Sequence, residues 1–337
     1  MTIYDYGYTG NEAGIVARIT SVHRERFGIA GSFGEGFARL KAKEYYAGEE
    51  IFPTVGDFVT IDYIENGDSR ILATLPRKTV FTRREPGPIP REQAVAANFD
   101  YVFILQSLNH DFNPRRLERY LTLSWQSGAT PVILLTKADL VEDYWEYLTQ
   151  VERVASGVNT HVVSARTGQG LPRLNAYLQP GKTLVFLGSS GVGKSSLVNA
   201  LAGREIMAVS EIREDDSKGR HTTTHRQLLL LRDRAMVIDT PGMREIGMWD
   251  VSEGLGDAFA DVEQFIGKCR FSDCKHETEP GCAIKRAIDA GELDISRWES
   301  YQKLKAENVD RDEMLRRKQE WHKTLSKFTK QRKKEIW

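Results

Sequence analysis

The stretch "GSSGVGKSSL" (residues 188–197) decides the fold of the domain that contains it. It follows the apolar run "TLVFL" (183–187) and leads into "VNAL" (198–201), which continues a helix-forming pattern. The stretch fits the phosphate-binding-loop pattern, and a preceding strand and a following helix are the context that this pattern requires. Glycines let backbone N–H groups turn toward phosphates at the amino end of a helix, where anions are favoured. We therefore predict a nucleotide site in an α/β domain.

Two side chains of this loop have predicted roles in phosphate and metal binding. Lys194 would neutralise the β- and γ-phosphates, and the Ser195 hydroxyl would bind Mg²⁺. The further predicted nucleotide contacts in the loop are Gly188, Ser190, Gly191, Gly193 and Ser196.

The stretch "VIDTPG" (237–242) follows the loop by about forty residues. Asp239 ends its apolar run and is the expected acid that holds Mg²⁺ through water. Gly242 can supply a backbone N–H to the γ-phosphate. Such a turn is common by itself, but at this spacing after a phosphate-binding loop it supports the nucleotide site.

The choice of base is indicated by "LLTKAD" (134–139), in which Thr136, Lys137 and Asp139 are the candidate contacts. An aspartate carboxylate can accept hydrogen bonds from N1–H and the N2 amino group of guanine, and adenine offers neither donor. The lysine stem can lie over the base. The stretch "VVSARTG" (162–168) suits the partner loop, with Ser164 and Ala165 supporting the base through the backbone. Together these stretches predict guanine specificity.

The guanine-reading stretch precedes the phosphate-binding loop, whereas ordinary GTPases have the reverse order. Moving the chain ends of a compact α/β domain has little energetic cost, because termini lie on the surface and often close together. The order observed here is a circular permutation, and it leaves all the nucleotide-binding loops at one edge of the sheet.

This combination resembles the RsgA (YjeQ) family, circularly permuted GTPases that assist maturation of the bacterial small ribosomal subunit. The resemblance covers nearly the whole chain, and its motifs are "PTVGDFV" (53–59), "LPRKT" (75–79), "QSLNHDFN" (106–113), "GRHTTTHR" (219–226) and a cysteine cluster. It implies hydrolysis of GTP to GDP and phosphate, stimulation by the small ribosomal subunit, contact with rRNA, and release upon hydrolysis.

One residue departs from the usual guanine-reading pattern, which often begins with an asparagine that ties it to the phosphate-binding loop. Here the position is Thr136. We expect looser nucleotide affinity with unchanged specificity, because the discriminating Asp139 remains.

The polar stretch "DDSKGRHTTTHR" (215–226) suits a switch I loop. One threonine should close over Mg²⁺, and Thr223 is preferred over Thr222 and Thr224. Many GTPases orient the attacking water with a glutamine after the Asp-x-x-Gly turn, but Met243 stands there. His221 is the nearest replacement in sequence, because its imidazole could orient water or accept a proton. The alternative is a histidine that packs the loop or meets RNA.

The three cysteines of the chain lie together with a histidine, as Cys269, Cys274, His276 and Cys282. Three thiolates and one imidazole make a closed tetrahedral set, which is the arrangement of structural zinc. The alternative is three free or buried cysteines. The family resemblance places zinc on the same four residues.

Residues 12–75 contain short alternating runs separated by glycine, such as "AGIVARITS" (13–21) and "DFVTIDYI" (57–64). They predict a barrel of about five strands of the OB type, with an SH3-like barrel or small sandwich as alternatives. We expect an OB-type barrel in 1–80, a Pro- and Arg-rich linker in 81–98, a circularly permuted α/β P-loop GTPase domain in 99–254, and a helical zinc-binding module in 255–337.

Composition gives broad limits. Lys+Arg and Asp+Glu are both 47, so net charge indicates no partner, and 40% hydrophobic with 28% charged residues suits a globular protein. The N-terminus lacks a secretory signal, and no apolar run approaches the roughly 18 residues that span a membrane. Few, clustered cysteines favour a reducing compartment, so we expect a cytoplasmic protein, and a monomer.

The end of the chain carries a basic stripe at helical spacing, formed by Arg316, Lys323, Lys327, Lys330 and Lys334. The apolar residues Met314, Trp321, Leu325 and Phe328 fall on the opposite face. A basic stripe is often only a solvated face, but beside a barrel and a zinc module it favours RNA contact.

The leading hypothesis is an RNA-directed GTPase switch. The alternatives are a non-hydrolysing RNA-binding module with a structural nucleotide site, and an ATP-dependent kinase, which Asp139 disfavours.

Overall fold

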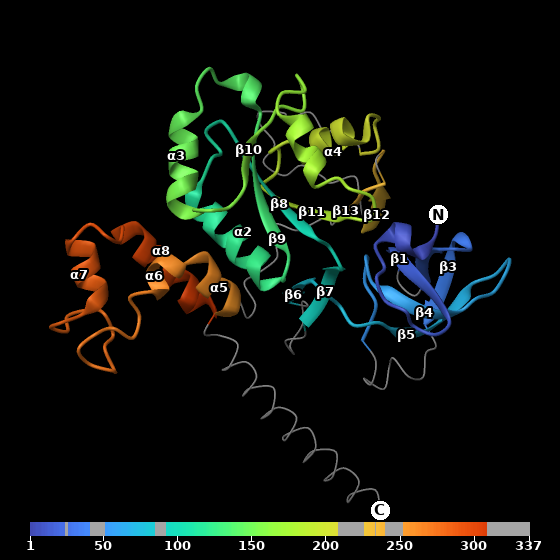
Figure 1. Ribbon diagram of the computed structural model, residues 1–337, viewed down its shortest axis with the longest axis horizontal. Coiled ribbons are helices and arrows are strands. Elements are labelled where there is room, and N and C mark those ends of the chain that lie inside the picture. Colours follow the sequence, from blue (N-terminus) through green and yellow to red (C-terminus); the bar gives the residue numbers. More distant parts are fainter. Residues whose placement is uncertain are drawn as a thin grey trace, which may run out of the picture. The chain divides into compact units, whose positions relative to one another are not determined.

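The apolar runs around the phosphate-binding loop form a six-stranded part of one larger sheet in the computed structural model (Figure 1). Its strands, in spatial order, are β10 (Thr160–Val162), β9 (Thr130–Thr136), β8 (Tyr101–Ser107), β11 (Thr183–Leu187), β13 (Met236–Asp239) and β12 (Gln227–Leu230). Five of them are parallel, and β12 pairs antiparallel with β13. Parallel strands place their carboxyl ends at one edge, where the predicted nucleotide loops begin.

The structure describes residues 1–23, 26–40, 51–84, 92–207, 226–232, 234–239 and 252–308. Four of the predicted features lie outside these residues: His221, Thr223, Gly242 and the basic stripe beyond Met314. Residues 1–81 and 94–246 form one compact unit, and 82–93 with 247–337 form a second.

Helices cover both faces of the sheet, as expected for strands with buried residues on both faces. Helix α4 (Lys194–Ala202) places Leu197 and Val198 in one apolar core with Phe103 and Leu105 of β8. Successive strand residues point to opposite faces, so Ile104 faces the other layer. Helix α2 (Pro114–Gln126) packs on β8 and β9 and contacts α3 (Trp145–Val154). In the described part of this unit, 3-10 turns are formed by η1 (Ile3–Tyr6), η2 (Ala138–Leu140) and η3 (Leu171–Ala176).

The N-terminal strands form a closed barrel, which confirms the predicted OB-type architecture. They are β1 (Ile15–His23), β2 (Arg26–Gly31), β3 (Gly34–Leu40), β4 (Phe58–Asp62) and β5 (Ser69–Thr74). The barrel runs β1-β2-β3-β5-β4 and closes by pairing β4 with β1, and only the β3–β5 pair is parallel. Inward side chains such as Ile19, Phe27 and Ile71 fill it.

The barrel and the GTPase sheet are joined edge to edge. Strand β1 pairs with β12 at Ser21 and Gln227, and Gln227 pairs in turn with Asp239 of β13. The guanidinium of buried Arg18 bonds to the backbone oxygens of Tyr6 and Asn98 and contacts the Met236 sulfur. The β1–β12 pairing makes one continuous sheet of the two predicted domains, and the Arg18 contacts reinforce the joint.

The segment expected to be a linker contains two strands that pair with one another, β6 (Val80–Arg84) and β7 (Glu92–Ala97). The N–H of Val80 donates to the Ser127 oxygen at the end of α2. The prolines and arginines of "REPGPIPREQ" (84–93) favour a turn, but the β-branched and aromatic residues before this stretch favour a strand.

The second unit has its own apolar core. Among its described residues, the helices are α5 (Ser252–Ala258), α6 (Ala260–Glu263), α7 (Ala283–Asp289) and α8 (Ile295–Asn308). Trp298 stacks on Tyr301, and Phe259 meets Tyr301 edge-on. Arg297 forms an ion pair with Asp261 (2.8 Å) beside this core. Within the described residues, no helix has the length and apolar character needed to span a bilayer.

Candidate nucleotide site and metal centre

The phosphate-binding loop joins β11 to α4 and has the backbone freedom that its sequence predicted. Gly191 and Gly193 have φ of +69° and +102°, which side chains rarely tolerate. At Gly188 a Cβ would lie 2.9 Å from Val192 and 3.1 Å from the Leu105 oxygen, so only glycine fits against β8. Lys194 begins α4, and its ammonium group donates to the Gly188 oxygen (2.7 Å) and the Ser189 oxygen (3.2 Å).

The guanine-reading stretch and its partner loop lie in contact. Asp139 belongs to η2, which follows β9, and the Ser164 hydroxyl donates to its carboxylate (2.5 Å). The Arg166 guanidinium lies 3.6 Å from the same carboxylate. The Ser164 hydrogen bond, aided by the Arg166 charge, holds the pKa of Asp139 below its ordinary value. The carboxylate is therefore ionised at neutral pH and can act as a hydrogen-bond acceptor for a base.

Two backbone features orient these loops. Lys137 has φ of +60°, so the chain turns sharply after β9. The N–H of Ala138 donates to the Val163 oxygen (3.2 Å), which fixes η2 beside the residues that precede Ser164. Ala165 follows and packs on the apolar core below the site.

The Thr136 side chain binds the phosphate-binding loop directly. Its hydroxyl donates to the Val192 oxygen (2.7 Å) and lies 3.4 Å from the Gln106 oxygen. We expected the departure from asparagine to weaken the tie between the two loops, but the structure retains this tie, because a buried hydroxyl can reach the same backbone. The expected looser affinity stays a prediction.

The remaining described contacts are placed by the ends of parallel strands. Asp239 ends β13, next to β11 and its loop, and Ser195 and Ser196 follow Lys194 in the first turn of α4. A serine hydroxyl and a carboxylate are the oxygen ligands that Mg²⁺ prefers, so the donor set fits the ion. Gly242 and the two switch residues His221 and Thr223 cannot be placed, because they lie outside the described residues.

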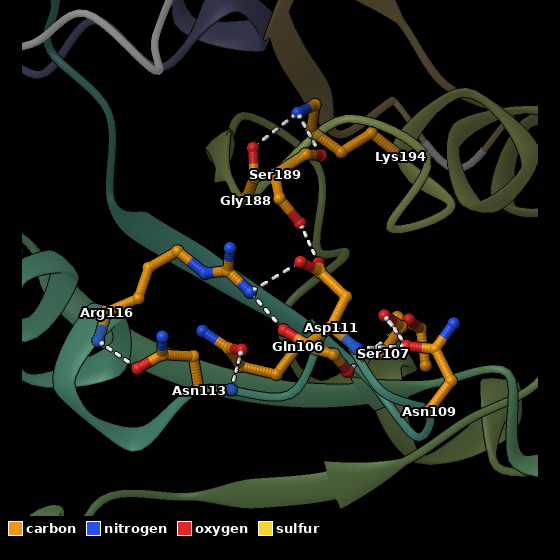
Figure 2. A network of polar contacts seen from close by, with 10 residues as sticks. Gln106, Ser107, Asn109, Asp111, Asn113, Arg116, Gly188, Ser189 and Lys194 are labelled. Atoms are coloured by element: carbon orange, nitrogen blue, oxygen red, sulfur yellow. Dashed lines mark hydrogen bonds and ion pairs between the residues drawn. The ribbon is translucent and has the colours of Figure 1, made fainter. Parts of the chain in front are cut away.

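A further polar network reaches this loop from the segment after β8 (Figure 2). The Ser189 hydroxyl donates to the Asp111 carboxylate, which also pairs with Arg116 (3.0 Å). Sequence reasoning used this segment only for family resemblance and assigned Asp111 no role. One available signal was Asn113 before Pro114, a helix-start pattern that places the preceding loop at the same sheet edge.

The predicted metal ligands come together in the second unit. The ligand atoms of Cys269, Cys274, His276 and Cys282 all lie within 4.8 Å of one another. The His276 Nδ1 atom is 3.4, 3.7 and 3.4 Å from the three sulfurs in that order. Bonds of about 2.3 Å to sulfur and about 2.0 Å to nitrogen would place tetrahedral ligands about 3.5 Å apart. The cluster therefore fits a zinc ion.

Neighbouring groups hold the four ligands in place. The N–H of Ala283, at the start of α7, donates to the Cys269 sulfur (3.3 Å), and the His276 ring packs edge-on against Trp298. The Glu279 carboxylate accepts three backbone N–H groups of the ligand loop, and the first of these, from Lys275, contributes most to lowering the pKa of Glu279 to about 2.

The order of the loops along the chain now defines a class of protein. The guanine-reading loop after β9 and its partner loop after β10 precede the phosphate-binding loop after β11 and the acid at the end of β13. All four lie at the carboxyl edge of one sheet. This is a circularly permuted P-loop GTPase.

Comparison with known proteins identifies the family. The sequence model described as RsgA GTPase matches residues 74–249. A Listeria innocua protein named small ribosomal subunit biogenesis GTPase RsgA 1 is 48% identical over 315 residues, 91% of this chain and 89% of that protein. A Vibrio parahaemolyticus protein named small ribosomal subunit biogenesis GTPase RsgA 2 is 41% identical, over 98% of this chain and 88% of its own. The chain belongs to the RsgA GTPase family and is a GTP hydrolase.

Solved structures agree with this fold. YjeQ from Thermotoga maritima has a TM-score of 0.66 and 29% identity, covering 87% of this chain and 98% of its own. YloQ, described as a circularly permuted GTPase, has a TM-score of 0.62 and 23% identity, covering 90% of this chain and 99% of its own, which supports the fold alone.

A second sequence model, described as ABC transporter, matches residues 171–332, less than half of the chain. The matched range contains the phosphate-binding loop, which ATPases and GTPases share. It leaves out the guanine-reading stretch at 134–139. We attribute the match to the shared loop.

Proposed function

We propose that this GTPase binds the small ribosomal subunit and hydrolyses GTP to drive its own release late in subunit maturation. The observation that carries the proposal is similarity along almost the full length to proteins named for small ribosomal subunit biogenesis, at 48% and 41% identity. A cytoplasmic location follows from that partner, and we expect a monomer.

The nucleotide site supplies the switch in this proposal. Asp139 would select guanine, Lys194 would bind the β- and γ-phosphates, and Ser195 with Asp239 would hold Mg²⁺. Bound Mg²⁺ would neutralise charge that develops on the phosphates. Gly242 and Thr223 would close on the γ-phosphate side, so that the GTP form and the GDP form present different surfaces to the subunit.

The other parts of the chain supply surfaces for rRNA. An OB-type barrel is a common platform for oligonucleotides. The four-residue metal centre would hold one structural Zn²⁺ and stiffen the module before the basic stripe. Cations on that stripe would contact phosphates without reading sequence.

The central experiment measures phosphate release from GTP with and without purified small subunits. We expect slow release by the protein alone and a large increase with subunits. A rate that small subunits leave unchanged would contradict the proposed stimulation, and no release under either condition would favour a non-hydrolysing binding module.

A second experiment tests His221 as the group that acts on the attacking water. On this hypothesis, docking on the subunit orders switch I and brings the imidazole to the γ-phosphate. His221→Ala should remove most of the subunit-stimulated rate and leave GTP affinity and basal hydrolysis nearly unchanged. A variant that binds the subunit and is still fully stimulated would show that the ribosome supplies the catalytic group.

A further inference from the structure

The loop after β8 reaches across the sheet edge and contacts the start of the phosphate-binding loop. The Ser189 hydroxyl donates a hydrogen bond to one oxygen of the Asp111 carboxylate, which joins two segments far apart in sequence (Figure 2). Ser189 follows Gly188 directly and has no role in the nucleotide contacts described above.

The Asp111 carboxylate is itself fixed from two sides. The Arg116 guanidinium, in the first turn of α2, lies 3.0 Å from its second oxygen and also donates to the Asp111 backbone oxygen. The Asp111 N–H donates to the Asn109 side-chain oxygen (3.0 Å), which also accepts from the Ser107 hydroxyl (2.8 Å). The carboxylate therefore has a set position before any nucleotide binds.

The base of α2 continues this support. Asn113 caps the helix by accepting from the Arg116 N–H (3.1 Å), and its own N–H donates to the side-chain oxygen of buried Gln106 (3.3 Å). Arg116 is thus held by its backbone as well as by its charge. A half-exposed ion pair alone would contribute little, but here the pair holds a carboxylate that serves another residue.

The phosphate-binding loop is consequently held at two points from two neighbouring strands. Asp111, after β8, holds its beginning through Ser189. Thr136, at the end of β9, holds its far half at the Val192 oxygen (2.7 Å). Between these points lie Ser190 and Gly191, whose N–H groups are expected to face phosphate. The Lys194 ammonium group donates to the oxygen of the same Ser189.

We propose that Asp111 is a positioning residue for nucleotide binding, which holds the phosphate-binding loop in its phosphate-accepting shape through Ser189. Arg116 orients the Asp111 carboxylate and balances its negative charge close to a site that must accept a polyanion. The apparent dissociation constant rises as the fraction of protein in the binding-competent shape falls. If removal of the hydrogen bond lowers that fraction to about one tenth, the dissociation constant rises about tenfold.

The test is calorimetric titration of the full-length protein with GDP and Mg²⁺, for Asp111→Ala, Ser189→Ala and the double variant. We expect each single variant to bind about tenfold more weakly at an unchanged stoichiometry near one per chain. The double variant should bind GDP no more weakly than whichever single variant binds it less tightly. The reason is that the same hydrogen bond is removed in both single variants and in the double variant. Ser189→Thr keeps the hydroxyl and should bind as the parent does.

His110→Ala is the matched control, because His110 is an exposed neighbour of Asp111 in the same loop. The GDP affinity of this variant should equal that of the parent protein. Effects of the two single variants that add in the double variant would overturn the proposal, as would unchanged affinity in Asp111→Ala. A lower stoichiometry with unchanged affinity would show that the network only stabilises the fold. The measurement involves no ribosome, so its outcome is independent of the proposed partner.

Discussion

The carboxylate proposed to read the base is oriented by one hydroxyl. Asp139 accepts from Ser164, a residue with no exposed surface, while the nearby Arg166 side chain is 81% exposed. The buried hydroxyl fixes the direction of the carboxylate, and the exposed cation adds a charge that solvent screens. Ser164 is therefore the more important partner, which agrees with its leading contribution to the lowered pKa of Asp139.

At this scale we predict that Asp139→Asn shifts preference from guanine toward xanthine. The amide offers a donor to the O2 carbonyl of xanthine, at the position where guanine has an amino group. Competition binding of GTP and XTP measures the change, and we expect at least about a tenfold loss for GTP, the effect of about 1.4 kcal/mol. Full GTP affinity with no gain for XTP would show that another loop reads the base.

The C-terminal helices form a small element for which the apolar core alone gives marginal stability. Residues 252–308 are in the size range in which burial on folding is marginal. Cys269, Cys274 and Cys282 belong to the same cluster as the core side chains around Trp298, so a metal ion there would join the ligand loop to α7 and α8. We therefore expect the metal-bound ligand loop and the core to unfold as a single cooperative structure.

We therefore predict one zinc per chain and its loss on combined Cys269→Ser and Cys274→Ser substitution. The second unit should unfold while guanine-nucleotide binding survives, because the free energy of structural zinc, about 10–16 kcal/mol in small metal modules, is free energy of folding. Metal analysis and two-step thermal unfolding check this. Freshly purified parent protein without zinc would refute it.

In the first unit, strand β12 connects the barrel to the GTPase sheet, because it lies between β1 and β13. Ser21, Gln227 and Asp239 lie on one line across three strands. Arg18, on the outer face of β1, secures the same joint through its bonds to Tyr6 and Asn98. Burial lowers the pKa of its guanidinium to about 10, so it remains charged at neutral pH. Asp239, the proposed Mg²⁺ ligand, is therefore separated from the barrel by only two adjacent backbone pairings.

We predict that Arg18→Met destabilises this unit by at least about 3 kcal/mol, since the oxygens of Tyr6, Gly56 and Asn98 lose a buried donor. Denaturant unfolding should become less cooperative as the barrel separates from the GTPase sheet. Arg70→Met, at an exposed barrel position, is the control and should change stability by less than about 0.5 kcal/mol. A cooperative transition at the parent midpoint would show that Arg18 does not secure the joint.

At the same scale we predict that replacing Lys323, Lys327 and Lys330 by Gln weakens small-subunit binding. Each lost phosphate contact should lower the slope of log affinity against log salt by roughly one, so the triple variant should lose about two to three. Binding measured across a salt series tests this, and an unchanged slope would assign the stripe to solubility.

The candidate ligand-binding residues could be predicted because ligand chemistry selects particular residue types at short spacing. The phosphate-binding loop, the guanine-reading stretch and the ligand set of Cys269 to Cys282 each occupy a few consecutive turns of chain. Their residue types are required by phosphate, base and metal wherever the loops lie in the fold. The periodicity of the apolar runs likewise predicted the barrel and the doubly covered sheet, since burial on one or both faces of a strand leaves a local pattern.

Tertiary structure alone decided how those loops are held. Thr136 meets Val192, Asp111 meets Ser189, and Arg18 meets Met236, across 56, 78 and 218 positions of sequence. In the sequence, a residue with a hydroxyl, carboxylate or guanidinium group gives the same pattern whether its side chain is solvated or hydrogen-bonded to another residue. Only the packing of strands brings such a group within bonding distance of its partner. The same reason explains the two paired strands in the expected linker, because local composition can favour a strand but does not show which segment it pairs with.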